Sequence, residues 1–249
     1  MVILLATVLA APVALVVGEA ILATRGAAVD TPDVATLSSV ITPESPRGEV
    51  RALWLGDSTA AAVGTSDADG AVSSVVGKAL SAQCQVSVAT SVVAVSGARI
   101  DDVLREQVPL VAGRKADIVF ISAGANDTIH LTSPARFSRV YAEVIEALVA
   151  AGVSSDHIVL IGVPDMGSPP RLAQPLRALM GWRGRRLDAR VQALAREKGA
   201  RYVDLFAGTS KPIRSDPPRY FAADDYHPND NGYALWGKTI TPVAAPICK

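Results

Sequence analysis

The stretch Arg51-Ala-Leu-Trp-Leu-Gly-Asp-Ser58 decides the fold class of this chain. Its apolar residues predict a short buried strand over residues 50–55. Ser58 then stands at the turn that leads from this strand into the next part of the chain. A serine at a strand-to-helix turn is suited to act as a nucleophile if a base lies nearby in the fold.

Strand-like and helix-like segments alternate through the rest of the chain. Five strands are predicted, at residues 50–55, 85–95, 116–122, 157–163 and 201–205. Helices are predicted at residues 71–82, 99–108, 133–150 and 229–241, and Ser96 is predicted to cap the second of them. A loop is predicted at residues 164–170. A further helix follows this loop and ends at Lys198, before Gly199. This alternation predicts an α/β fold with a five-stranded parallel sheet covered by helices on both faces.

The residues with catalytic potential follow the carboxyl ends of these predicted strands. Ser58 follows the first strand, Gly97 the second and Asn126 the third, while Asp224 and His227 come after the fifth. In parallel sheets, sites form at that edge. Because the strands were chosen by apolar pattern and the residues by chemistry, their agreement predicts one common site.

Ser58, His227 and Asp224 are the predicted nucleophile, general base and orienting acid. Of the three histidines, His227 has an aspartate three positions before it. Asp225 is the competing acid, and the ordinary alternative for Ser58 is a helix N-cap, a role that its position also allows.

Three donors are predicted to stabilise an oxyanion: the backbone N–H of Ser58, the backbone N–H of Gly97 and the side-chain amide of Asn126. A glycine or an asparagine in a turn is the ordinary alternative for the last two. Asp57 and Asp127 are expected to brace the turns beside them.

Four short motifs in this order resemble the SGNH (GDSL-type) hydrolase family. They are Gly56-Asp57-Ser58 with Gly64, the lone Gly97, Gly124-Ala-Asn126-Asp127 and Asp224-Asp-Tyr-His227-Pro. The resemblance implies a flavodoxin-like three-layer sandwich and hydrolysis of an ester, thioester or acyl amide, and the chain is similar to actinobacterial lipase/esterase-like members. The first motif departs from the common pattern, because Thr59 stands where Leu or Ile is usual.

The predicted function is hydrolysis of carboxylic esters through an acyl-enzyme, on a small acyl ester or a lipid or glycan ester. Acyl transfer or deacylation on cell-envelope glycans or lipids is an alternative with the same residues. An inactive binding module on a membrane surface is a third, which the intact serine, asparagine and histidine disfavour. No cofactor or metal is predicted, since the histidines and cysteines lack ligand spacing. Nucleic acid is not expected as a partner, because 24 basic residues balance 24 acidic ones.

The beginning of the chain differs from the remainder. Residues 1–24 are almost wholly apolar and predict a membrane anchor or signal segment, residues 25–49 a linker, and residues 50–249 the hydrolase domain. Arg25 after the apolar run favours a cytoplasmic domain. Cys84 and Cys248 favour the opposite, because their expected pairing at the amino end of the sheet needs an oxidising compartment. We therefore expect a membrane-tethered or secreted, extracytoplasmic protein.

Overall fold

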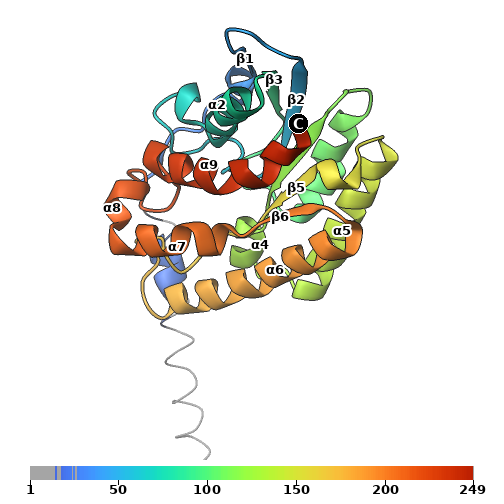
Figure 1. Ribbon diagram of the computed structural model, residues 1–249. Coiled ribbons are helices and arrows are strands. Elements are labelled where there is room, and N and C mark those ends of the chain that lie inside the picture. The colour runs from blue at the N-terminus through green and yellow to red at the C-terminus, as the bar shows by residue number, and fades with distance from the viewer. Residues whose placement is uncertain (1–14, 16–17, 24, 26, 249) are drawn as a thin grey trace, which may run out of the picture.

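A six-stranded, mostly parallel sheet forms the centre of the computed structural model (Figure 1), which describes the chain except for residues 1–14, 16–17, 24, 26 and 249. The strand order is β1-β3-β2-β4-β5-β6. The strands are β1 (Ser39–Ile41), β2 (Glu49–Gly56), β3 (Ser87–Val92), β4 (Ile118–Ser122), β5 (Ile158–Ile161) and β6 (Arg201–Val203). The five parallel strands lie at the predicted places, so the predicted α/β class is confirmed.

The expected count of five strands is wrong by one. β1 pairs antiparallel with β3, with Val40 opposite Ala89, and it comes from residues predicted to be a linker. It is three residues long and forms an edge of the sheet, and its Val40 side chain is 66% exposed. A strand this short has too few residues for an alternating pattern to appear in the sequence.

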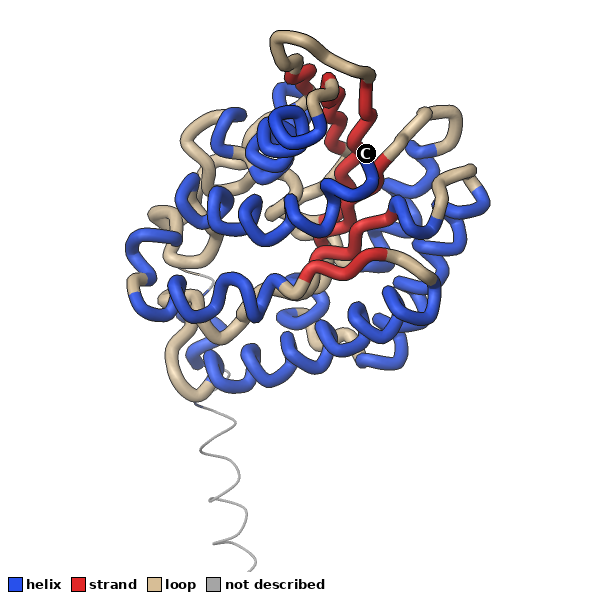
Figure 2. Tube along the Cα trace, viewed as in Figure 1, coloured by secondary structure: helices blue, strands red, loops and turns tan. Residues whose placement is uncertain are grey.

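Helices cover both faces of the sheet, as Figures 1 and 2 show. The longer helices are α2 (Val72–Cys84), α5 (Pro134–Ala150), α6 (Leu176–Lys198) and α9 (Asp230–Ala244). α2 packs on α9 at one face, and α5 packs on α6 at the other. Successive residues of β2 serve the two sides alternately, because Leu53 and Leu55 join the core under α5 and α6 while Trp54 joins the other.

Shorter helices fill the connections. They are α3 (Ile100–Asp102), α4 (Ala125–Ile129), α7 (Leu205–Ser215) and α8 (Pro217–Tyr220), with η1 (Val34–Leu37), η2 (Ala68–Gly70), η3 (Val103–Gln107), η4 (Val108–Val111), η5 (Ser155–His157) and η6 (Ala245–Cys248). The sequence patterns did not predict α4, α7 or α8. α4 and α8 have five and four residues, too few for a helical period to show, and Pro212 within α7 argues against a helix there.

The ends of the long helices agree well with prediction. Ser133 caps α5 by accepting a hydrogen bond from the Arg136 N–H, and Gly199 ends α6 at φ 72°. The predicted cap at Ser96 is wrong. The Arg99 N–H instead bonds to the Asp102 carboxylate at 2.9 Å, and the predicted helix continues as a π turn and a 3₁₀ turn.

Cys84 and Cys248 form a disulfide with their Cα atoms 6.0 Å apart, which confirms their predicted pairing. The bond joins the end of α2 to η6, 164 residues further along the chain. Within the described part of the chain, no helix has both the length and the apolar character needed to cross a bilayer. Most of the segment predicted as an anchor lies outside those residues.

Candidate active site

The turn that carries Ser58 depends on Gly56, the last residue of β2. Gly56 has a φ of 141°, and a side chain there would overlap the carbonyl oxygen of Ser122 on β4. The buried Gln107 amide bonds both the N–H and the carbonyl of Gly56 at 2.8 Å. Ser58, two residues later, is therefore held against a rigid strand end, with 7% of its surface exposed.

Ser58, His227 and Asp224 meet although 169 residues separate the first two. His227 Nε2 lies 3.1 Å from Ser58 Oγ, and His227 Nδ1 lies 2.6 Å from Asp224 Oδ2. The second oxygen of Asp224 accepts the N–H groups of Tyr226 at 3.0 Å and His227 at 2.9 Å. Burial opposes ionisation of Asp224, but the hydrogen bonds from His227 and Tyr226 outweigh it and hold the pKa of this carboxyl below its usual value. The carboxylate is thus ionised and aimed at the imidazole.

Asp225 points away from this chain of hydrogen bonds. Asp225 is exposed and has a left-handed backbone conformation with φ 56°, whereas its buried neighbour Asp224 faces His227. The structure therefore places Asp224 in the position that the spacing predicted. Of the other histidines, His130 Nδ1 lies 2.9 Å from the carbonyl of Asn126, and His157 Nδ1 lies 2.9 Å from that of Asp117.

The loop with His227 presses against the turn after Ser58. Gly64, at φ 98°, has no room for a side chain, because a Cβ there would overlap the Pro228 carbonyl oxygen. The buried Tyr233 hydroxyl of α9 donates to the Val63 carbonyl at 2.8 Å. These contacts fix the distance between the nucleophile turn and the histidine loop.

Gly97 lies in the loop between β3 and α3, Asn126 lies in the first turn of α4, and these two segments are bonded to each other. Asn126 Nδ2 donates to the Ala98 carbonyl at 3.1 Å, and the buried Asp127 carboxylate accepts the Ile100 N–H at 3.0 Å. Gly97 has open space around it, so its φ of 85°, rather than a close neighbour, is what favours glycine at this position. The Asn126 amide retains a second N–H, and its side chain faces the pocket described below.

Asp57 is almost fully buried behind the nucleophile turn. It accepts the Thr59 N–H at 2.9 Å and the Thr59 hydroxyl at 2.7 Å, and that hydroxyl also lies 2.8 Å from Ser122 Oγ. Burial raises the pKa of Asp57 to about 6, and the bonds from Thr59 only partly oppose this. Burial likewise raises the pKa of Asp127. Asp57 thus braces the turn beside it, whereas the Asp127 carboxylate bonds the start of α3 rather than the asparagine turn.

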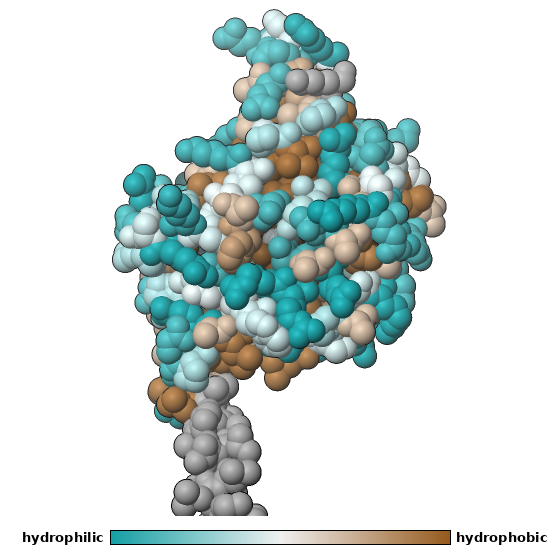
Figure 3. Space-filling view, turned by 60° about the horizontal axis from the view of Figure 1, so that its bottom comes forward, coloured by the Kyte–Doolittle hydropathy of each residue, from teal (hydrophilic) through white to brown (hydrophobic). Residues whose placement is uncertain are grey.

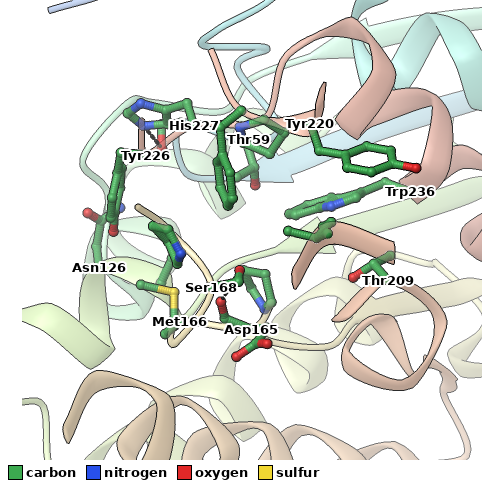
Figure 4. A pocket seen from close by; sticks show the side chains of 17 residues that line it. Thr59, Asn126, Asp165, Met166, Ser168, Thr209, Tyr220, Tyr226, His227 and Trp236 are labelled. Carbon is green, nitrogen blue, oxygen red and sulfur yellow. Dashed lines mark hydrogen bonds between the residues drawn. The ribbon is translucent and has the colours of Figure 1, made fainter. Parts of the chain in front are cut away.

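A pocket opens beside Ser58 and His227. Figure 4 shows Asn126 and Tyr226 on one side, Tyr220 and Trp236 on the other, and Asp165 at the end away from His227. The walls come partly from the 164–170 loop and partly from α7 and α8, the helices that the sequence did not predict. Asp165 is 4% exposed and forms an ion pair with Arg214 of α7, with Nη2 and Oδ1 2.9 Å apart.

Arg171 was not singled out by any sequence pattern, yet it supports the histidine loop. Its backbone N–H donates to the Asp225 carbonyl at 3.1 Å, and its Nη1 donates to the Asp224 carbonyl at 3.3 Å. The same side chain bonds the carbonyls of Ala23 at 2.6 Å and Ala27 at 2.9 Å. Arg171 therefore joins the beginning of the described chain to the loop that orients His227.

For metals, the described residues contain no group of three or more His, Cys, Asp or Glu side chains arranged to hold an ion. The chemistry available at this site is that of a serine, an imidazole and a carboxylate in sequence, with amide donors beside the serine. This arrangement is the one that nucleophilic acyl transfer uses.

Comparison with known proteins agrees with this geometry. Residues 54–235 match the model of the GDSL-like Lipase/Acylhydrolase family. The chain belongs to this family. The resemblance seen in the four sequence motifs is thereby confirmed.

Among curated proteins, the chain is similar to the GDSL-like esterase Rv1075c of Mycobacterium tuberculosis, with 30% identity over 189 residues. The match covers 75% of the chain but only 59% of the length of that esterase.

Solved structures share the fold. TesA aligns with a TM-score of 0.61 at 21% identity, over 79% of this chain and 99% of its own. A lipase/acylhydrolase from Enterococcus faecalis aligns with a TM-score of 0.61 at 24% identity, over 78% and 94% of the two chains. Axe2, an acetylxylan esterase from Geobacillus stearothermophilus, aligns with a TM-score of 0.59 at 18% identity, over 80% and 95%. The predicted SGNH hydrolase fold is therefore confirmed.

Proposed function

We propose that this chain hydrolyses carboxylic esters through an acyl-enzyme intermediate on Ser58. The observation that carries the proposal is the continuous relay from Asp224 through His227 to Ser58, with heavy-atom distances of 2.6 and 3.1 Å. Both distances lie within the range in which proton transfer is efficient. Membership of a lipase/acylhydrolase family supports the same reaction.

In the first half of the reaction, Ser58 Oγ attacks the ester carbonyl carbon while His227 Nε2 takes the hydroxyl proton. Asp224 holds Nδ1 and stabilises the imidazolium that forms. The negative charge on the carbonyl oxygen is met by the N–H groups of Ser58 and Gly97 and the free amide N–H of Asn126. His227 then gives its proton to the departing alkoxide, and the acyl group remains on Ser58.

In the second half, water replaces the alcohol. His227 takes a proton from the water as its oxygen attacks the acyl carbon, and the same charge forms on the carbonyl oxygen. Collapse breaks the bond to Ser58 Oγ, which recovers its proton from His227. The products are a carboxylic acid and an alcohol, and the enzyme is unchanged.

The pocket supports a preference for short acyl groups. Its end is formed by the buried Asp165 carboxylate, which pairs with Arg214 and also accepts the Gly167 N–H at 3.1 Å. An alkyl chain long enough to reach this ion pair would press a methyl group against charged atoms and gain nothing from burial there. An acyl group that ends beside Met166 and Trp236 avoids this contact.

Acyl transfer remains an alternative of the same class, because an alcohol could replace water in the second half. A binding module without activity is disfavoured, since binding alone requires no imidazole aligned between a serine and a buried carboxylate.

The test is a series of p-nitrophenyl esters from acetate to palmitate, run with and without an alcohol acceptor. We expect kcat/KM to be highest for the short esters, and alkyl ester products with the acceptor would show transfer. Ser58→Ala should lower kcat by more than about 1,000-fold and abolish labelling by a fluorophosphonate, with little change in Tm. Ser96→Ala, at an exposed serine of the same edge, is the matched control. Retained labelling in Ser58→Ala would show that another residue is the nucleophile.

A further inference from the structure

Exposed apolar side chains gather at the end of the molecule where the described chain begins. They are Ile129 at the end of α4, Leu131 just after it, and Leu179 and Trp182 on α6, with 38%, 59%, 36% and 47% of their surfaces exposed. We call these four residues the apolar patch. Figure 3 views this end and shows brown hydrophobic groups among teal polar ones. The patch is unusual for a water-facing surface, because large apolar side chains there lie close together rather than singly.

The two parts of the patch are held together by Arg183 of α6. Its Nε donates to the Thr128 carbonyl at 3.2 Å, and its Nη2 donates to the Thr132 carbonyl at 3.1 Å. These bonds clamp both ends of the segment that carries Ile129 and Leu131 against the helix that carries Leu179 and Trp182. The patch is therefore a built surface rather than a set of loose side chains.

Leu131 adds a second observation, because it adopts a left-handed backbone conformation with φ 59°. For a leucine this conformation is strained by roughly 1–3 kcal/mol, and such strain concentrates at functional sites. Its neighbours hold it there, since the Thr132 N–H bonds the Asp127 carbonyl at 2.9 Å. The strain places a 59% exposed leucine side chain at the surface, where water gives it no stabilisation.

The first described residues of the chain pack at this same end. Ala20 and Ala23 share an apolar groove with Ile129 and Met180, and the Glu19 carboxylate accepts the Leu176 N–H at 2.9 Å. Before Glu19, residues 2–18 contain no charged side chain. A run of about 20 apolar residues matches the hydrocarbon thickness of a bilayer. A chain continuous with such a segment would bring the apolar patch to the bilayer first.

A cationic side chain borders the patch. The Arg186 guanidinium lies 4.8 Å from the centre of the Trp182 ring. Tryptophan and arginine together are typical of the headgroup level of membranes, where the ring is half-buried and the cation meets phosphate.

We propose that the apolar patch rests in the headgroup region of a lipid bilayer, with Arg186 directed at lipid phosphates. Tyr226 lines both the catalytic pocket and the apolar groove beside the patch. Contact with lipid through the patch would therefore hold the pocket close to the bilayer surface. This inference concerns binding and does not depend on the proposed reaction.

Trp182 is a natural reporter for this contact. The other two tryptophans, Trp54 and Trp236, are 0% and 2% exposed, so a lipid-dependent change in emission reports on Trp182. The full chain is reconstituted in vesicles of phosphatidylcholine and phosphatidylglycerol, with and without bromine on the lipid carbons nearest the headgroup. We expect brominated lipid to quench the emission of the full chain, and Trp182→Phe to lose this quenching while still co-sedimenting with the vesicles.

A second variant pair makes the test independent of Trp182. Leu131→Ser/Leu179→Ser should make the quenching at least about twofold weaker, because two apolar anchors are lost. The control Val40→Ser/Val149→Ser changes two exposed valines elsewhere and should leave it unchanged. Co-sedimentation without quenching would overturn the proposal, since the chain would then be held by its first residues alone. Trp182 emission already shifted to the blue without lipid would also overturn it, because a protein segment or a second copy would cover the patch.

Discussion

His227 is oriented by both oxygens of one carboxylate. One Asp224 oxygen receives the imidazole Nδ1, and the other receives two backbone N–H groups, so the acid cannot rotate without losing three hydrogen bonds. A carboxylate held this way selects the tautomer in which Nε2 faces Ser58 with a free lone pair. We therefore expect Asp224 to act by orientation and by charge rather than by taking the proton itself.

Asp224→Asn should lower kcat by about 10³- to 10⁴-fold with a small change in KM, because the amide can stabilise the wrong tautomer. Fluorophosphonate labelling should become slower but persist. Asp225→Asn is the matched control, since asparagine tolerates the left-handed turn there and the side chain faces solvent. Steady-state kinetics of both variants are the measurement. A greater loss in Asp225→Asn would mean that the orienting acid had been misassigned.

Asp57 should make stability depend on pH. Its pKa rises from 3.8 in the unfolded chain to about 6 in the fold, so folding favours the protonated form. The stabilisation from this group is complete below pH 3.8 and is lost as the pH rises to 6 and above. Relative to Asp57→Asn, which keeps the shape and cannot ionise, the wild-type free energy of unfolding should fall by about 2.5 kcal/mol from pH 4 to pH 7.

Urea unfolding of both proteins across this pH range measures the difference. Other titrating groups are common to the two proteins and cancel. A difference that stays constant with pH would show that Asp57 has the same pKa in the folded and unfolded states.

At the scale of elements, the pocket forms where the β5–α6 connection packs against α7. The connection supplies Asp165 and Met166, and α7 supplies Thr209, Ile213 and the Arg214 that pairs with Asp165. β5 and α7 belong to separate parts of the chain. One ion pair, between the β5–α6 connection and α7, forms the end of the pocket. Changing that pair should change acyl length selectivity and leave the relay in place.

Asp165→Ala/Arg214→Ala should raise kcat/KM for p-nitrophenyl octanoate relative to acetate by about tenfold, because about two additional methylene groups can be buried. Both partners are removed together, since a single buried charge left unpaired would destabilise the fold. Asp165→Asn/Arg214→Gln keeps the bulk and removes the charge, so it separates steric from electrostatic closure. Unchanged acyl length selectivity in both double variants would show that the acyl group does not bind in this pocket.

At the scale of the whole molecule, one covalent bond closes most of the domain. The disulfide joins Cys84 at the end of α2 to Cys248 beyond α9, and these two helices pack on the same face of the sheet. The closed loop includes β3 to β6 and four of the residues placed in the site: Gly97, Asn126, Asp224 and His227. Cross-linking so long a loop restricts the unfolded chain more than the folded one.

Cys84→Ser/Cys248→Ser should lower the free energy of unfolding by up to about 5 kcal/mol on the chain-entropy model. Urea unfolding with and without reductant measures it, and the reductant should act on the wild type alone. Equal stability of the two proteins without reductant would mean that the bond adds no constraint beyond the packing of α2 on α9.

The same bond supports our proposal that the protein works outside the cytosol, because structural disulfides persist in oxidising compartments. Mass spectrometry of unreduced protein from its native membrane tests this. Two free thiols there would contradict export and favour the orientation indicated by Arg25.

The local structure and the reactive residues of this protein could be predicted from its sequence. The apolar strands β2 to β6, the Ser133 and Gly199 helix ends and the order of the four motifs all depend on short-range patterns of side chains. Such patterns involve residues that are close together in the chain, so they can be recognised without knowledge of the fold. The spacing of Asp224 and His227 belongs to this class, because both lie in one turn and the acid bonds the backbone of that turn.

Tertiary structure alone decided what surrounds that chemistry. β1 exists because β3 offers it an unpaired edge, and α7 and α8 are too short or too interrupted to form by pattern alone. Asp165 meets Arg214, and Arg171 meets the Asp224 carbonyl, across 49 and 53 residues of chain. No local spacing encodes contacts of this kind, because they form only when separate elements pack on the sheet. The sequence therefore determined the reactive groups, and the packed fold determined the shape of the pocket and the surface that borders it.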